Sequence, residues 1–392
     1  MPTVAEQVDE IQSKQGINSP DLIGPLTNLG LIFREQGDAN LAIAAFERAR
    51  HVVRVNYGLS SFKEAPLVRQ LVQIEEARGN AAAAWELEQE LLGMIYGSPA
   101  PRPTSRFRPP ARLSKASPAG AASMLREIAD KRLDVLERYV AGEFPPQIEL
   151  GCYYAGPPRR DGTETAPESC ISGSARSVRQ ALYEETRLYY LDTMAMFSEG
   201  RSPEEVPDLY LAVVRAMYAT RNDYTTEYQG RGTLRSIHSR LVKYSKPLRD
   251  QMNALVDIAD WDLLFAGGRK ETEAAFQAYE ALYMRLQQEG LEQSFIDEIF
   301  SPSAPVVLPA FSPNRLISSK TPNSSGYIDV AFEITKYGEG KAIEILDTTT
   351  ITATEARIRL RDLIQRSRFR PRMANGAFED PSRVVVRYYV ND

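Results

Sequence analysis

Residues 26–49 read Leu-Thr-Asn-Leu-Gly-Leu-Ile-Phe-Arg-Glu-Gln-Gly-Asp-Ala-Asn-Leu-Ala-Ile-Ala-Ala-Phe-Glu-Arg-Ala, and this stretch decides the fold of the N-terminal region. Leu26, Leu29 and Phe33 recur at three- and four-residue spacing, which places them on one face of a helix. Gly37 then interrupts the pattern, because glycine favours the tight turn that ends a helix. The stretch therefore predicts a helix, a turn and a second helix.

The second half places Ala42 and Phe46 on one face of its helix, with Asp38 as the expected N-cap. Gly30 and Ala42 are small where the two helices must approach closely. The pattern of the stretch resembles a tetratricopeptide repeat: it has a large residue, Leu-Gly, an aromatic residue and then Ala-x-x-x-Phe, with Leu26 in place of the usual Trp. The resemblance implies stacked helix pairs, because one repeat cannot bury its apolar face alone.

A degenerate copy is expected 42 residues further along the chain. There Leu71, Gly79 and Ala84 repeat the leucine, glycine and alanine of the first copy. Glu75 and Glu88 occupy the positions of its two phenylalanines.

Five segments follow from these patterns. Helical repeats are predicted for 1–96, and further helices for 119–300, where 253–288 carries a third, degenerate repeat. Six prolines within 97–118 predict an extended connector, and the prolines and serines of 301–325 predict a linker between domains.

After this linker, residues 326–392 change from helical to alternating periodicity. Strands are predicted at 328–334 and 341–346, a helix with a capping box at 352–364, and a last strand at 384–390. The sequence thus predicts an α+β protein, with a helical-repeat solenoid followed by a small β-β-α-β domain.

Three sequence features accompany this order: Gly-Tyr-Ile-Asp-Val-Ala-Phe-Glu-Ile from Gly326, a glycine-bearing hairpin at 338–340, and Arg-Phe-Arg-Pro at 368–371 before Gly376. Together with the order of the elements, they resemble the C-terminal domain of TonB-type energy transducers. In that family the domain lies in the periplasm of Gram-negative bacteria and adds an extended receptor segment beside its last strand. The family's proline-rich spacer and Tyr-Pro motif are not found, so the resemblance extends to recognition and not to energy transduction. It implies an edge-strand site made of Val384, Val385, Val386, Arg387, Tyr388, Tyr389 and Val390. An unpaired sheet edge also recruits extended peptides on physical grounds alone.

Arginines are concentrated in the same region, with seven among residues 357–372. Residues 313–392 carry a net charge of +3 and residues 1–312 a net charge of −8. A solvated helix face explains most such arginines, and docking to an acidic partner or to the acidic helical region is the functional alternative. The possible docking residues are Arg357, Arg361, Arg368, Arg370 and Arg372.

The two cysteines, Cys152 and Cys170, both fall in a turn-rich loop predicted at 146–176. A disulfide between them is expected, and it requires an oxidising compartment; two free thiols are the alternative. No stretch of 18 apolar residues is present, as a membrane helix requires. The protein is expected in the periplasm if a signal peptide precedes this chain or was removed from it, and in the cytoplasm otherwise.

Composition and motifs favour binding over catalysis. The net charge of −5 predicts no general affinity for nucleic acid, and two histidines and two cysteines make a metal site improbable. No phosphate-binding loop or HExxH motif is found, and no cofactor is expected. The less favoured enzyme hypothesis uses carboxylates of the middle region, Glu184 or Asp192.

The sequence therefore predicts a non-enzymatic adapter of the bacterial envelope. Its helical repeats would bind one protein partner in a groove, and the C-terminal sheet edge would hold an extended peptide of an envelope protein. The alternative is a cytoplasmic tetratricopeptide scaffold whose terminal domain caps or dimerises the array.

Overall fold

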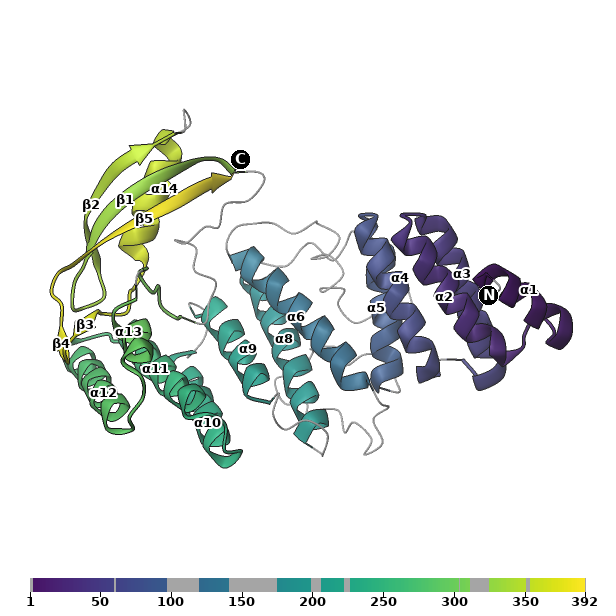
Figure 1. Cartoon of the computed structure of the whole chain (residues 1–392), viewed down its shortest axis with the longest axis horizontal. Coiled ribbons are helices and arrows are strands. Elements are labelled where there is room, and N and C mark those ends of the chain that lie inside the picture. The colour runs from purple at the N-terminus through teal and green to yellow at the C-terminus, as the bar shows by residue number, and fades with distance from the viewer. Residues whose placement is uncertain are drawn as a thin grey trace. The chain divides into compact units, whose positions relative to one another are not determined.

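The computed structural model describes residues 3–59, 61–96, 120–140, 175–198, 206–221, 226–302, 304–310, 324–349 and 353–391. The chain forms two compact units, Met1–Asp223 and Tyr224–Asp392. The first unit is helical throughout its described residues, and the second combines helices with a small sheet (Figure 1). The predicted α+β class, with helices first and a C-terminal sheet, is confirmed.

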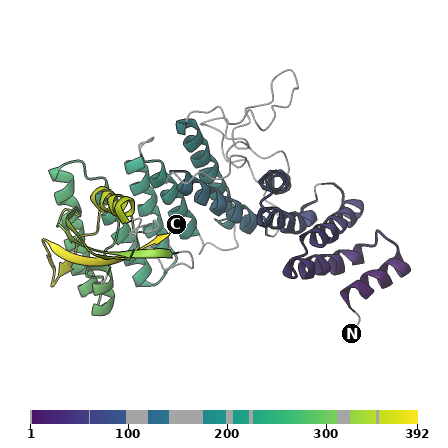
Figure 2. The same ribbon diagram turned by 90° about the horizontal axis from the view of Figure 1, so that it is seen from above.

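In the first unit, short connections join the successive helices from α1 to α5. Their bounds are α1 Val4–Gln15, η1 Pro20–Leu22, α2 Ile23–Glu35, α3 Ala39–Tyr57, η2 Phe62–Glu64, α4 Ala65–Ala77, α5 Ala81–Tyr96, α6 Ala121–Val140, α8 Ala175–Ser198 and α9 Val206–Ala219. Successive helices pack side by side from α2 to α5 (Figures 1 and 2).

Helices α2 and α3 pack through the residues that the sequence singled out. A Cβ on Gly30 would lie 2.8 Å from the ring of Phe46, so a larger residue there would force the helices apart. Gly37 has a φ of +83°, which the turn between the helices requires. Asp38 stands at the N-cap of α3, but its side chain makes no capping hydrogen bond.

The pattern residues of the first repeat all contribute to packing. Leu26, Gly30, Ala42 and Phe46 are buried, whereas Leu29 and Phe33 are half-buried. Most belong to one core that α1, α2, α3 and α4 share. The two positions of the second copy that lack phenylalanine hold buried carboxylates, since Glu75 and Glu88 are both under 10 % exposed.

The second unit begins with four helices. They are α10 Thr226–Lys243, α11 Leu248–Leu264, α12 Arg269–Gln288 and α13 Gln293–Phe300. Successive helices from α10 to α12 pack against each other, and Gly230 of α10 lies against the buried Trp261 of α11. Their core also includes Met373, far along the chain.

The sheet follows these helices. Its elements are β1 Ser324–Ile334, β2 Gly340–Thr348, α14 Ala353–Arg366, β3 Met373–Ala374, β4 Ala377–Phe378 and β5 Ser382–Asn391. Strands β2, β1 and β5 form an antiparallel sheet in that order, while β3 and β4 form a separate short hairpin. Helix α14 covers one face of the sheet with Leu360 and Ile364. Alternate residues of β1, such as Val330 and Phe332, fill the core beneath it.

Two segments join the sheet to the helices of the same unit. Val307 and Phe369 form an isolated β-bridge, and the Leu308 amide donates to the Arg368 carbonyl at 2.7 Å. Leu308 is buried in the helical core, so residues 304–310, within the segment expected to be a linker, are packed in the unit. No periodic pattern marks this segment in the sequence, so its packing could not be predicted.

Candidate peptide-binding edge and repeat pocket

Strand β5 lies at an edge of the sheet and, among the described residues, pairs with β1 alone. The pairing runs without a register shift from Gly326 opposite Val390 to Ile334 opposite Ser382. One side of β5 is therefore bonded to β1, and from Ser382 to Tyr388 the other side presents a regular row of backbone groups. Such a row is a template for another extended chain.

The other edge strand, β2, is irregular. Its pairing with β1 shifts register twice, between Asp329 and Val330 and between Ala331 and Glu333. Ala342 within it has a φ of +48°, which is rare for a residue with a side chain. Bulges of this kind twist an edge and prevent pairing with other chains. Of the two edges, β5 is thus the better template.

The two faces of β5 differ sharply. Val384 and Val386 point to α14 and are 5 % and 8 % exposed. Val385 points to the opposite face and is 59 % exposed. A strand added beside β5 would therefore extend an apolar layer on one face and meet an open valine on the other.

Two arginines flank Val385 on that open face, and carboxylates of neighbouring strands hold both. Arg387 donates from Nε and a terminal nitrogen to the two oxygens of Asp329, both at 2.8 Å. This hydrogen bonding lowers the pKa of Asp329 and raises that of Arg387. Arg383 reaches Glu344 on β2 at 2.8 Å. The arginines thus tie the three strands together across the open face.

Of the five arginines expected to dock an acidic partner, Arg370 cannot do so, because it is buried inside the unit. Its guanidinium forms two hydrogen bonds with Asp260 of α11, at 2.9 and 2.6 Å, and a third with the carbonyl of Ile299. The Tyr279 hydroxyl donates to the same carboxylate at 2.7 Å. Burial opposes the charge, but Asp260 raises the pKa of Arg370 above its ordinary value. Arg370 thus joins the sheet region to α11, α12 and α13.

The other four arginines differ in exposure and in their partners. Arg368 is half-buried and donates to the carbonyl of Tyr337 at 3.0 Å. Arg372 is also half-buried and lies 3.5 Å from Glu379. Arg357 and Arg361 on α14 are exposed, so these two remain available to a partner.

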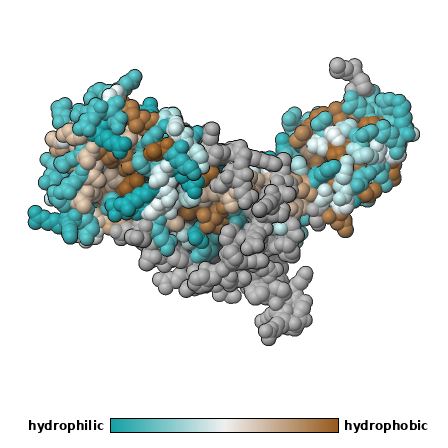
Figure 3. All heavy atoms as spheres, turned by 90° about the horizontal axis from the view of Figure 1, so that it is seen from below, coloured by the Kyte–Doolittle hydropathy of each residue, from teal (hydrophilic) through white to brown (hydrophobic). Residues whose placement is uncertain are grey.

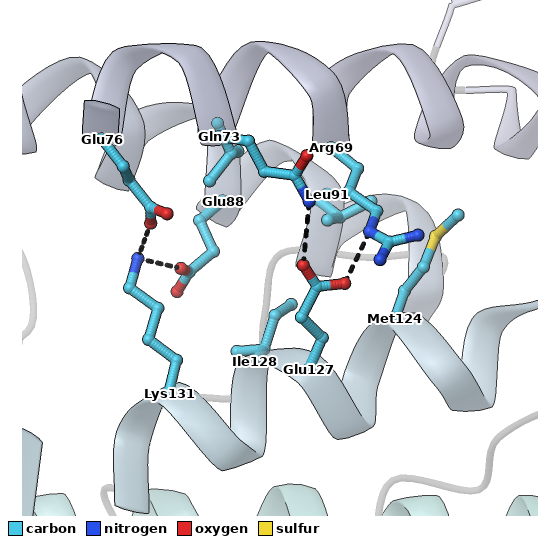
Figure 4. Close-up of a pocket in the computed structure, with 10 residues that line it drawn as sticks. Arg69, Gln73, Glu76, Glu88, Leu91, Met124, Glu127, Ile128 and Lys131 are labelled. Atoms are coloured by element: carbon cyan, nitrogen blue, oxygen red, sulfur yellow. Dashed lines mark hydrogen bonds and ion pairs between the residues drawn. The ribbon is translucent and has the colours of Figure 1, made fainter. Parts of the chain in front are cut away.

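In the first unit a cavity of about 220 Å³ opens between α4, α5 and α6 (Figure 4). Its lining combines apolar and charged side chains: Arg69, Val72, Gln73, Glu76, Glu88, Leu91, Met124, Glu127, Ile128 and Lys131. On the face of the molecule seen in Figure 3, apolar atoms over the N-terminal helices are bounded by hydrophilic ones.

Ion pairs bridge the walls of this cavity (Figure 4). Glu127 of α6 accepts from Gln73 at 3.1 Å and lies 2.5 Å from Arg69, both on α4. Lys131 of α6 contacts Glu76 of α4 and lies 3.2 Å from Glu88 of α5. Burial opposes the charge of Lys131, but the two carboxylates raise its pKa. The cavity thus has a polar rim whose groups already have partners.

Behind the cavity lies a buried charged network. Arg132, 2 % exposed, contacts Glu88, and its Nε lies 3.7 Å from Glu185 of α8. The hydroxyl of Tyr189 donates to Glu185 at 2.7 Å, and burial raises the pKa of this carboxyl. The buried Glu88 that weakened the second repeat in sequence is therefore the partner of Arg132.

The two carboxylates of the enzyme hypothesis have different partners. Asp192 is fully buried, accepts a hydrogen bond from Tyr96 at 2.8 Å, and has a pKa raised to about 6, chiefly by burial. Glu184 is half-buried and lies 3.7 Å from Arg187. The described residues contain no group of three or more His, Cys, Asp or Glu placed to hold a metal ion.

Several sequence predictions concern residues outside the described ranges. Cys152 and Cys170, the loop at 146–176 up to the start of α8, and the connector at 97–118 lie there. The disulfide therefore stays a prediction. Among the helices that are described, none is long and apolar enough to cross a lipid bilayer.

Comparison of the chain with protein-family models and with curated protein sequences gives no match.

Proposed function

We propose that this chain is a non-enzymatic adapter that binds an extended peptide along β5 and a second protein on its N-terminal helices. The observation that carries the proposal is the regular edge of β5, which pairs with β1 along one side without a register shift from Ser382 to Val390. Backbone hydrogen bonds along such an edge supply affinity, and alternate side-chain positions supply specificity.

The resemblance to the C-terminal domain of TonB-type transducers supports the same site. The β-β-α-β order holds with one addition, the β3–β4 hairpin between α14 and β5. The segment corresponding to the family's peptide-binding strand is β5. We extend the proposal to the bacterial envelope on this resemblance, and fractionation of the native cells tests that part separately.

The helical partner site is the tetratricopeptide-like region. Short turns join α2 to α3 and α4 to α5, and the pattern residues of the first repeat pack between helices. The cavity beside α4 offers apolar side chains beneath a charged rim, which suits an apolar anchor residue of a protein partner.

Binding of peptides selected from a displayed random library to the full-length chain tests the edge. Adjacent residues of a strand direct their N–H groups to opposite sides. Of Val385→Pro and Val386→Pro, one variant therefore loses a bond to β1, and the other loses a donor on the free side.

We expect one of these variants to remain as stable as the parent while losing peptide binding. Leu346→Lys on β2 is the control, and this variant should bind peptide as the parent does. If every proline variant that folds binds peptide as tightly as the parent does, β5 is not the binding site.

A further inference from the structure

Helix α3 carries a row of side chains that its own packing leaves exposed. Its core face is occupied, since Ala42 and Phe46 belong to the core that α1 to α4 share. On another face, Leu41 and Val55 are 50 % and 53 % exposed, although both side chains are aliphatic. Ala44, between them, is exposed as well. This row is therefore apolar at both ends and open to solvent.

The spacing of the row is that of a seam between two helices. Its members follow one another at intervals of three, four, three and four residues, which places them on one line along the helix. We call them the outer stripe of α3: Leu41, Ala44, Arg48, His51 and Val55. At a rise of 1.5 Å per residue the line is about 21 Å long, which matches two heptads of a partner helix.

The middle of the outer stripe is basic. Arg48 and His51 are exposed, and no side chain among the described residues forms an ion pair or a hydrogen bond with either. The other two arginines of α3, Arg50 and Arg54, both pair with carboxylates of the first unit. The outer stripe thus complements a helix that has carboxylates at its centre and apolar residues towards both ends.

A second copy of α3 is a poor occupant of this face. In a parallel pair, Arg48 lies opposite Arg48 of the other copy. In an antiparallel pair with full overlap, Arg48 lies opposite either Arg48 or His51 of the other copy. Opposed like charges at an interface are costly, so the outer stripe favours a partner of opposite charge over self-association.

We propose that the outer stripe of α3 docks an amphipathic helix of an acidic partner protein. Carboxylates at the centre of that helix pair with Arg48 and His51. Apolar residues near its two ends cover Leu41 and Val55. A single helix face is a small interface, so the association is expected to be weak and to weaken further with salt.

Docking of such a helix rests on one part of the proposed function, namely that the N-terminal helices have a protein partner. It gives that partner a surface and a chemistry, and it depends neither on the cavity beside α4 nor on the edge of β5.

Two synthetic helical peptides, each about three heptads long, test the proposal with the full-length chain. Both carry leucine at the outer seam positions. The acidic probe has glutamate at the two central seam positions, and the basic probe has lysine there. We expect the acidic probe to bind about tenfold more tightly than the basic probe, because only its central charges oppose those of the outer stripe. Fluorescence anisotropy of the labelled probes measures both dissociation constants.

Charge reversal on α3 sharpens the test. Arg48→Glu should reverse the preference, so that the basic probe binds more tightly. Its side chain is exposed, so the fold should be unaffected, and circular dichroism checks this. Arg235→Glu, the same change at an exposed position of α10, is the matched control and should leave both dissociation constants unchanged. Leu41→Ser removes one apolar end and should weaken the binding of both probes.

Two results would overturn the proposal. If neither probe binds, or if Arg48→Glu leaves the preference for the acidic probe unchanged, the outer stripe is not the docking surface. Self-association of the parent chain that Leu41→Ser abolishes would give the face to a second copy instead.

Peptide binding along β5 separates this docking surface from the rest of the proposed function. If the probes behave as expected but no selected peptide binds along β5, the edge fails and the outer stripe stands. If a selected peptide binds along β5 and the chain does not distinguish the two probes, only the outer stripe fails.

Discussion

The two edges of the C-terminal sheet differ in how well each edge strand can pair with another extended chain. Strand β5 pairs with β1 without a register shift from Ser382 to Val390, whereas β2 has two register shifts and a residue with positive φ. Both edges carry exposed apolar residues, Val385 at 59 % and Leu346 at 48 %. Exposure alone therefore does not distinguish them; backbone regularity does.

The edges also differ in how they are anchored. Strand β2 leaves β1 through a tight turn that places Gly338 and Gly340 against Phe369 and Ile364. Strand β5 follows a segment that Arg370 fixes to the helices through Asp260. The following predictions separate these contributions, beginning with the largest effect.

Removing the anchor of β5 should have the largest effect. Arg370→Met leaves the buried Asp260 carboxylate without its cationic partner, so the second unit should lose about 3 to 5 kcal/mol of unfolding free energy. Urea unfolding followed by the fluorescence of Trp261, in a Trp85→Phe background, measures the change. Arg372→Met is the matched control and should cost less than about 1 kcal/mol, because its ion pair is partly exposed. Equal losses would show that Arg370 has no special role.

The turn at the start of β2 should be the next most sensitive. Gly338 has a φ of +74°, and a Cβ there would lie 2.4 Å from the carbonyl oxygen of Phe369. Gly338→Ala should therefore cost about 2 to 4 kcal/mol. Gly376 in the β3–β4 turn has a φ of +81° but no atom closer than 3.5 Å to such a Cβ, so Gly376→Ala should cost only about 1 kcal/mol. A reversed order in the same urea experiment contradicts this account of the turns.

The anchor of β5 should also respond to pH through Asp257. Burial, together with the charge of Asp260, raises the pKa of Asp257 to about 7 from an ordinary value of 3.8. The folded unit then holds a proton that the unfolded chain has released, so stability should rise as pH falls through 7 and level off near 4. Asp257→Asn should flatten this rise in urea unfolding at a series of pH values, whereas the exposed Asp297→Asn should not. A parent protein whose stability falls steadily from pH 7 to pH 5 would contradict the assignment.

The smallest effect should come from the ion pairs of the open face. Arg387→Ala should lower the stability of the second unit only slightly, because exposed ion pairs contribute little. A double-mutant cycle with Asp329→Ala, at low and high salt, isolates the pair. A coupling energy that does not decrease with salt would show that the pair is not solvent-exposed in solution.

Local patterns sufficed for much of this fold. The spacing of Leu26, Gly30 and Phe46 predicts the first helix pair, and alternation along 328–334 and 384–390 predicts the strands at the edge. These predictions succeed because each depends on residues close together in the sequence, which face one core through a fixed period.

The interactions that join distant segments could not be predicted in this way. Arg370 and Asp260 are 110 residues apart, and Arg132 and Glu88 are 44 residues apart. A buried ion pair has no periodic signature, so the sequence alone indicates a surface position for Arg370 and a degenerate repeat at Glu88. The shifts in β2 also depend on tertiary packing, and no residue of that strand predicts them.

Amide hydrogen exchange of the full-length chain, with and without a selected peptide, tests the central claim most directly. We predict that peptide binding slows exchange in residues 382–391 and leaves residues 340–348 unchanged. Slower exchange in β2 with none in β5 would contradict the claim that β5 is the edge that binds.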